Sequence, residues 1–186
     1  MALAHAILAT LLDHPCSGYD LRKRFEGSVG FFWQASFQQI YRELNKLEEE
    51  GWLSAETIHQ QHRPDKKVYR VTKRGEDALK AWIEAPCEIA PIKDDLLVKA
   101  FSGYAVSRRT FLAELRQHQT QHQERLAVYR QIEQQFFPQP QALPMKEKFR
   151  YLTLLNGIQF ETAWLTWCED AIALLESSPA NEAIEP

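Results

Sequence analysis

The sequence predicts a mainly α-helical protein with one small β-hairpin: an N-terminal winged helix-turn-helix followed by an all-helical C-terminal dimerisation domain. Two observations carry this fold class. Apolar residues recur at helical spacing along most of the 186 residues, and strand character is confined to one stretch of the first half. Two prolines at residues 86–91 separate the halves. We expect a winged-helix domain at residues 1–85, a hinge at 86–92, a helical domain at 93–177 and a flexible tail at 178–186.

Three helices open the first half, and two of them carry capping signals. The first helix covers residues 3–12. Ser17 is expected to cap the second helix, with Asp20 three residues later in a capping-box-like pair. Ser36 and Gln39 have the same spacing and are expected to open the third helix. Local chemistry alone therefore places two helix starts in this domain.

The third helix has two different faces. One face is apolar and follows the helical period through Phe37, Ile40, Leu44 and Leu47. The other face offers hydrogen-bonding and basic side chains, namely Gln38, Gln39, Tyr41, Arg42, Asn45 and Lys46. Gln, Asn and Arg have the groups that read base edges in the major groove of DNA, and Tyr and Lys can hold phosphates. A solvated helix face is also polar, so this helix alone does not separate a DNA reader from a plain surface.

A hairpin follows, with strands expected at residues 52–59 and 67–71 and a fourth helix capped by Thr72. Residues 62–74 hold six basic side chains against one acid, a local charge of +5: Arg63, Lys66, Lys67, Arg70, Lys73 and Arg74 against Asp65. The whole of residues 1–85 holds 12 basic and 12 acidic side chains. This concentration of cations on the hairpin, which is the wing of a winged helix, favours contact with phosphates.

Five ordered segments of the first half resemble the PadR family of bacterial transcriptional regulators. They are AILATLL (6–12), SGYDL (17–21), FW (32–33), IYRELNKLEEEG (40–51) and KVYRVTKRG (67–75). The second half is similar in length and helical layout to the longer PadR subfamily, which includes the phenolic-acid-responsive members, and residues 93–101 match it. The resemblance implies a homodimeric DNA-binding protein, usually a repressor. It would release DNA when a small, often aromatic effector binds near the junction of the two domains.

The resemblance also implies which residues face DNA. The residues carried over lie at the start of the second helix, on the third helix and on the wing: Ser17, Tyr19, Gln38, Gln39, Tyr41, Arg42, Arg63, Lys66 and Lys67. Ser36 and Lys46 of the third helix are further DNA-binding candidates, which the residues themselves suggest. Gly18 fits the family turn and is expected to be structural, whereas Tyr69 either anchors the wing or touches DNA. Where relatives commonly have Leu and Pro, this chain has Ile40 and Arg42. We expect Arg42 to give the chain its own operator preference.

A seam of residues that are alternately four and three apart runs through residues 107–136. It comprises Phe111, Leu115, His118, His122, Arg125, Tyr129, Ile132 and Phe136, and such a repeat favours packing of helix against helix. The last helix, at residues 145–176, has a matching run from Phe160 to Leu174. The two helices would form an antiparallel hairpin covered by a second subunit, with the dimer contact at Phe111, Leu115, Tyr129, Phe160 and Leu174. A monomeric hairpin folded back on the winged helix is the alternative.

The middle of this seam is polar, because His118, His122 and Arg125 occupy it. The two histidines lie four apart on one helix face, but the other ligands of a zinc site are missing, so no metal is expected. A solvated stretch of helix is a second interpretation. The third is an effector site, in which these cations bind an aromatic carboxylate beside Trp164 and Trp167.

Composition and motifs narrow the remaining classes of protein. A net charge of -3 excludes a strongly basic coat, and three distant cysteines favour neither a disulfide framework nor a zinc site. Because no P-loop, dinucleotide fingerprint, nucleophile elbow or HExxH helix is present, we expect no enzyme and no cofactor. No apolar run approaches the roughly 18 residues of a membrane span. Residues 1–12 lack the basic start of a signal peptide, so we expect a cytoplasmic protein.

These observations together predict a homodimeric transcriptional regulator. The resemblance implies that it acts as a repressor, which a small phenolic-acid-like effector would release from palindromic double-stranded operator DNA. The competing interpretation is a winged-helix module that binds another protein without specific DNA binding. Salt dependence separates the two, because phosphate contacts make DNA binding fall steeply as the salt concentration rises.

Overall fold

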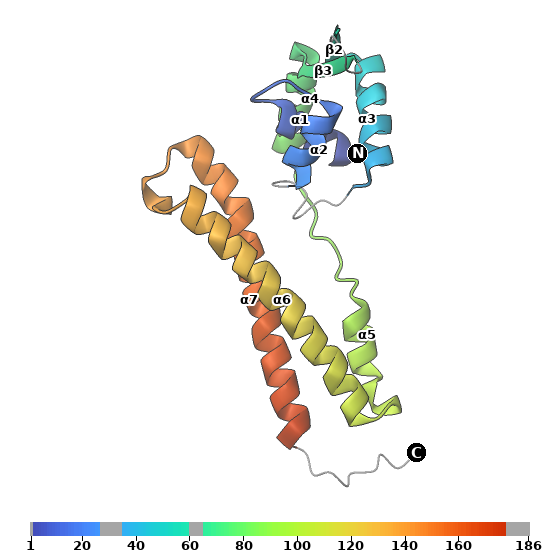
Figure 1. The fold of residues 1–186 in the computed structure, drawn as a ribbon, viewed down its shortest axis with the longest axis vertical. Helices are drawn as coiled ribbons and strands as arrows, with labels where there is room; N and C mark the ends of the chain where they lie inside the picture. Colours follow the sequence, from blue (N-terminus) through green and yellow to red (C-terminus); the bar gives the residue numbers. More distant parts are fainter. Residues whose placement is uncertain (1, 27–34, 60–64, 178–186) are drawn as a thin grey trace. The chain divides into compact units, whose positions relative to one another are not determined.

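The computed structural model describes residues 2–26, 35–59 and 65–177, and the chain divides into two compact units, Met1–Ala90 and Pro91–Pro186. The first unit combines helices with a small antiparallel sheet, and the second is helical wherever it has regular structure (Figure 1). This confirms the predicted fold class. Residues 86–94, which include the predicted hinge, form neither helix nor strand.

Four helices surround the core of the first unit: α1 (Ala2–Leu11), α2 (Gly18–Glu26), α3 (Phe37–Glu49) and α4 (Lys73–Glu84). Each contributes apolar side chains that are almost completely buried, including Leu8, Leu21, Leu44 and Leu79. Burial of a leucine side chain contributes about 1.5–3 kcal/mol, so this shared core fixes how the helices pack. It thereby holds α3 against α1 and α2.

A three-stranded antiparallel sheet completes the first unit. Its strands are β1 (Cys16–Ser17), β2 (Leu53–Ile58) and β3 (Lys66–Val71), in the order β1-β3-β2. The predicted hairpin is confirmed as β2 and β3, whereas β1 was not predicted because two residues carry no readable alternation. Tyr69 pairs with Cys16 in this sheet and lies buried in the core. Of the two roles considered for Tyr69, burial fits the one that anchors the wing.

The second unit consists mainly of two long helices. Its elements are α5 (Asp95–Phe101), the 3₁₀ turns η2 (Gly103–Ala105) and η3 (Pro140–Ala142), α6 (Arg108–Phe136) and α7 (Met145–Ser177). At one end of the hairpin Arg108 of α6 donates a hydrogen bond to the Leu175 carbonyl (3.3 Å), and at the other Tyr151 of α7 donates one to Glu133 (2.7 Å). The helices are therefore antiparallel, as predicted (Figure 1). None of the described helices combines the length and apolarity that crossing a membrane requires.

The α6–α7 contact uses only part of the predicted seam. Leu115, His122 and Tyr129 are buried in it, but Arg125 and Phe136 are exposed. On α7 the buried side chains are Ile158, Glu161 and Cys168, while the predicted run is half-buried or exposed: Phe160, Trp164, Trp167, Ala171 and Leu174. Apolar residues lie on every side of α7, so their spacing does not single out the face that meets α6.

Candidate functional site

The N-terminus of α3 is held by a complete capping box. The Ser36 hydroxyl accepts a hydrogen bond from the Gln39 backbone N–H (3.2 Å), and the Gln39 side-chain oxygen accepts one from the Ser36 backbone N–H (2.8 Å). This confirms the predicted helix start. The bond from the Ser36 backbone N–H uses the amide oxygen of Gln39, so both N–H donors of its NH₂ group are left for another partner. Gln38 and Arg42 are exposed beside it on the same helix.

Phe37 is the first residue of α3, and it does not belong to the core. The apolar stripe predicted on this helix is buried at Ile40, Leu44 and Leu47, but Phe37 is 48% exposed. The prediction was wrong at this position because the stripe begins one turn before the core covers it. The Phe37 ring lies against Tyr41, with 4.4 Å between ring centroids, and the Arg22 guanidinium is 5.7 Å from its centre.

Tyr41 is positioned by Gly18, the first residue of α2. A Cβ atom at Gly18 would lie 2.7 Å from the Tyr41 hydroxyl oxygen, closer than such contacts occur in proteins. Gly18 is buried and Tyr41 is half-buried, so the tyrosine ring lies directly over the glycine. This close approach ties the start of α2 to the N-terminal half of α3, two of the places expected to face DNA. It agrees with the structural role expected for Gly18.

The wing lysine Lys66 forms an ion pair with Asp20, a residue of the N-terminal cap of α2. The Ser17 hydroxyl accepts a hydrogen bond from the Asp20 backbone N–H (3.2 Å) and donates one to the Asp20 carboxylate (2.8 Å). Lys66 lies 2.8 Å from the same carboxylate, and the Lys66 and Ser17 bonds hold the pKa of Asp20 below its ordinary value of 3.8. Ser17 is buried and committed to this cap, whereas its neighbour Tyr19 is exposed beneath the Lys23 ammonium group.

The second wing lysine is paired in a similar way. The Lys67 ammonium group donates a hydrogen bond to Glu48 on α3 (2.6 Å), and this bond raises the pKa of Lys67 above its ordinary value. Both wing lysines thus bridge to helices while remaining partly exposed. Exposed ion pairs contribute only about 0–1 kcal/mol, so a phosphate group can replace the carboxylate in either pair. The third wing candidate, Arg63, lies outside the described residues.

Lys46, the remaining candidate on α3, is exposed near the other end of the helix. Its ammonium group lies 3.9 Å from Glu43 and 3.8 Å from Glu50, one turn away on either side. Such pairs along a helix surface contribute a few tenths of a kcal/mol and leave the lysine free to move.

A buried polar cluster lies between α6 and α7. The Nδ1 atom of His122 is 2.5 Å from the carboxylate of Glu161, and both residues are buried. The His122 ring stacks on Trp164, with 5.2 Å between centroids and 3° between planes, and Trp167 packs edge-on against Trp164. Arg125 reaches the other Glu161 oxygen at 3.8 Å. The structure thus brings four of the five predicted effector residues into one cluster, in which His122 and Arg125 meet the Glu161 carboxylate and the two tryptophans pack beside His122.

Glu161 was missed by the sequence analysis, although its position gave a signal. An acidic residue within the apolar run of α7, three residues before Trp164, needs a partner when it is buried. The solvated interpretation of this stretch does not fit the buried His122. The fifth candidate, His118, is half-buried; its ring centroid is 6.2 Å from that of His122 and its Nε2 atom is 3.8 Å from Glu114. Across the described ranges, no three His, Cys, Asp or Glu side chains gather to hold a metal ion.

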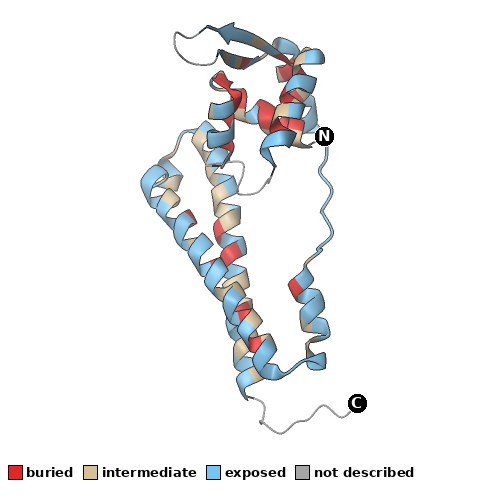
Figure 2. Ribbon diagram, turned by 45° about the vertical axis from the view of Figure 1, so that its right-hand side comes forward, coloured by how far each residue is buried: buried red, intermediate tan, exposed pale blue. Residues whose placement is uncertain are grey.

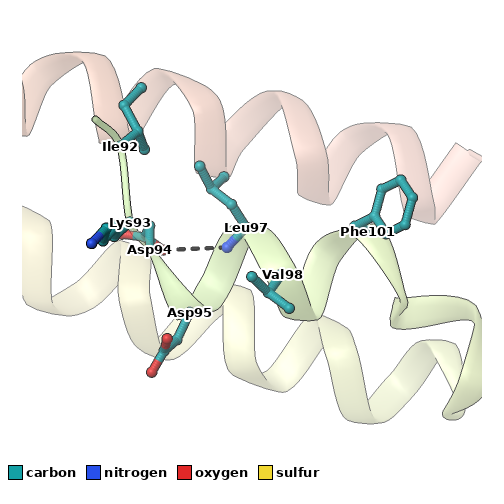
Figure 3. A pocket seen from close by; sticks show the side chains of 7 residues that line it. All are labelled: Ile92, Lys93, Asp94, Asp95, Leu97, Val98 and Phe101. Carbon is teal, nitrogen blue, oxygen red and sulfur yellow. Dashed lines mark hydrogen bonds between the residues drawn. The ribbon is translucent and has the colours of Figure 1, made fainter.

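An open apolar groove follows α5 and the segment before it (Figure 3). Its apolar lining, Ile92, Leu97, Val98 and Phe101, is exposed, with Phe101 88% accessible. Asp94 caps the helix by accepting hydrogen bonds from the Leu96 and Leu97 backbone N–H groups, and the bond to Leu97 is the dashed line in Figure 3. The groove adds to a largely exposed surface on the two long helices (Figure 2).

Of the predicted dimer residues, the structure assigns two to packing within one chain. Leu115 and Tyr129 are buried between α6 and α7, and Phe111 is half-buried. Tyr129 packs so closely on Gly157 that a Cβ atom there would lie 2.9 Å from its ring. Phe160 and Leu174, by contrast, are 54% and 70% exposed.

Two family models match the chain. The one described as "Transcriptional regulator PadR-like family" covers residues 7–81, and the one described as "Virulence activator alpha C-term" covers residues 92–176. The interval between the two matches, residues 82–91, contains the end of α4 and most of the segment without regular structure that joins the units.

Several relatives match nearly the whole chain. A probable transcriptional regulator of Mycobacterium tuberculosis is 36% identical, over 95% of this chain and 98% of the relative. Bacillus subtilis PadR in complex with operator DNA superposes with a TM-score of 0.84 at 27% identity (94% and 99% of the two chains), and its complex with p-coumaric acid with a TM-score of 0.78 (95% and 100%). The Vibrio cholerae virulence activator AphA gives a TM-score of 0.76 at 30% identity (94% and 98%).

These matches extend across both units, and the PadR-like match at residues 7–81 includes α3 and the hairpin of β2 and β3. The family and the relatives are transcriptional regulators and not enzymes. The chain therefore belongs to the PadR-like family of transcriptional regulators.

Proposed function

We propose that this protein is a homodimeric repressor that binds a palindromic operator through α3 and the wing, and that a small phenolic-acid-like effector releases it. The observation that carries the proposal is the capped N-terminus of α3, where Gln38 and Arg42 are exposed and Tyr41 is half-buried. The wing lysines Lys66 and Lys67 of the same unit are partly exposed as well. A helix-turn-helix reader places this end of its second helix against base edges in the major groove. The Bacillus subtilis relative solved with operator DNA supports the assignment.

The exposed apolar surface of the second unit supports the homodimer. Phe101, Phe160 and Leu174 are each more than half exposed, and the groove along α5 adds Ile92 and Val98. Large contiguous apolar surfaces mark interaction sites on soluble proteins. We propose that a second copy of the chain covers this surface. Two copies would then present two α3 helices to two half-sites of one operator.

The polar cluster of α6 and α7 supports an acidic aromatic effector. Trp164 and Trp167 offer aromatic faces, and His122 and Arg125 already hold one carboxylate, that of Glu161. An aryl carboxylate would compete with Glu161 for the same two side chains. The relative solved with p-coumaric acid, a phenolic acid, supports this ligand class.

Release needs two conformations that differ in the spacing of their α3 helices. An effector shifts the population only by binding one conformation more tightly than the other. A hundredfold shift needs about 2.7 kcal/mol of differential affinity, at about 1.4 kcal/mol per tenfold. Residues 86–94, which include Pro86 and Pro91 and have no regular structure, are the proposed pivot.

Fluorescence anisotropy tests the proposal, with labelled DNA from upstream of the gene titrated at two salt concentrations. We expect specific, salt-sensitive binding at two chains per duplex, reversal by a hydroxycinnamate, and reduced transcription from that promoter in vitro. The variant His118→Ala/His122→Ala should bind DNA as the parent does but resist release. Release that persists unchanged would place the effector elsewhere. Binding no tighter than to random DNA would favour the protein-interaction module.

A further inference from the structure

Phe37 is a large apolar residue that the core of the first unit leaves about half exposed. It is the first residue of α3 and 48% exposed, although the residues that follow it in the stripe are buried. Exposure of a large aromatic side chain forgoes the stabilisation that its burial would give. On the surface proposed to face DNA, such a side chain is available for contact with a ligand.

The neighbours of Phe37 hold its ring in place and suggest what it meets. Tyr41, one turn later, packs against it at 4.4 Å between centroids, and Tyr41 is itself fixed over Gly18. Arg22 of α2 lies over the ring at 5.7 Å from its centre. Gln38 is exposed next to it in sequence. The ring is thus an apolar element within a polar and basic surface.

The major groove offers one apolar feature to such a ring. Guanine, cytosine and adenine present hydrogen-bond donors and acceptors there, whereas thymine adds the C5-methyl group, a known contact of Phe side chains. A phenyl ring can form no hydrogen bond with a base edge. We propose that Phe37 is a specificity-determining residue that contacts the C5-methyl group of one thymine in each half-site. This inference rests on the operator binding proposed above and adds a base preference to it.

Replacement of thymine by uracil in the DNA tests this contact, because the two bases differ only by that methyl group. A duplex selected by the full-length protein from a random pool serves as the probe, and each thymine is replaced in turn. We expect one position per half-site at which uracil weakens binding about fourfold. That factor corresponds to about 0.8 kcal/mol for one buried methyl group at about 1.4 kcal/mol per tenfold. Uracil at the other positions should have little effect.

Three variants assign the effect to Phe37. Phe37→Ala should bind thymine and uracil duplexes equally, whereas Phe37→Leu should keep part of the discrimination because it keeps an apolar tip. Leu12→Ala is the matched control: Leu12 is 49% exposed at the edge of the same unit, so its loss should leave the fourfold effect unchanged. Circular dichroism and the thermal midpoint check that every variant is folded.

The outcomes separate this inference from the proposed function. Specific, salt-sensitive binding that ignores every uracil substitution would overturn the Phe37 contact and leave operator binding intact. A Phe37→Ala variant that discriminates as strongly as the parent would overturn it as well, because another residue would then read the methyl group. If no sequence is selected from the pool, operator binding itself fails and the inference falls with it.

Discussion

Lys66 is paired with a carboxylate although its position suits a phosphate. Asp20 lies 2.8 Å from it and also belongs to the cap of α2. We predict that Asp20→Asn, which keeps a capping oxygen but removes the charge, strengthens operator binding at low salt. It should also steepen the plot of log K against log [salt] by about 0.9 for each phosphate gained.

The measurement is anisotropy over a series of salt concentrations. Glu114→Gln is the matched control, because it frees Lys99 from a similar 2.5 Å pair in the other unit and should leave the slope unchanged. An unaltered slope for Asp20→Asn would mean that Lys66 does not face DNA.

A tyrosine–carboxylate bond links α6 and α7 and makes stability depend on pH. The Tyr151 hydroxyl, followed by Arg130, holds the pKa of Glu133 below its ordinary value of 4.5. Because the folded pKa is the lower one, this bond stabilises the protein fully above about pH 4.5, and the contribution is lost as the pH falls through the folded pKa.

We therefore predict that Tyr151→Phe lowers the free energy of unfolding by about 1.5–3 kcal/mol near neutral pH, the size of a hydrogen bond to a charged group. The difference from the parent should shrink in acid below the ordinary pKa of Glu133. Urea unfolding at a series of pH values and one fixed protein concentration measures it. A difference that stays constant into acid would contradict this account of the bond.

At the scale of the elements, Gly18 sets the distance between α2 and α3. A Cβ atom at this position would meet the Tyr41 ring at 2.7 Å, so Gly18→Ala must displace that ring. Because the clash falls on the far end of one side chain, we predict a loss of stability below about 1 kcal/mol. Operator binding should nevertheless fall to the level of Tyr41→Ala, because the ring no longer occupies its place.

A double-mutant cycle distinguishes an effect of Gly18 through Tyr41 from independent contributions of the two residues to DNA binding. If Gly18 acts through Tyr41, the variant Gly18→Ala/Tyr41→Ala binds DNA no more weakly than Tyr41→Ala alone. Additive losses would show that Gly18 itself, or the backbone of α2, contributes separately to the interface.

Elements whose signals are local were predictable, and those that depend on distant partners were not. The Ser36–Gln39 capping box lies within four residues, so spacing alone identified the start of α3. The exposure of Phe37 depends on where the core ends, which no periodicity records. The packed face of α7 was missed because that helix is apolar all round. Glu161 was missed for a similar reason, because its partner His122 lies 39 residues away.

At the scale of the whole molecule, one chain leaves an apolar surface that a partner would cover. Phe101 on α5 is 88% exposed, so a charge there costs a single chain little. Buried in an interface, the same charge would lack both water and a partner and would cost several kcal/mol. We predict that Phe101→Asp reduces the mass in solution from twice 21.6 kDa towards 21.6 kDa.

Sedimentation velocity over a range of protein concentrations measures this change, with Ile58→Asp as a control, since it places the same charge on a 44% exposed residue of the wing. The dissociated variant should also bind the palindrome more weakly than the parent protein does. Its affinity for an isolated half-site should equal that of the parent, because each copy reads one half-site. A variant that keeps the dimer mass would place the interface on other residues of α6 and α7. Loss of half-site binding as well would show that dimerisation shapes the reading surface and does not merely double it.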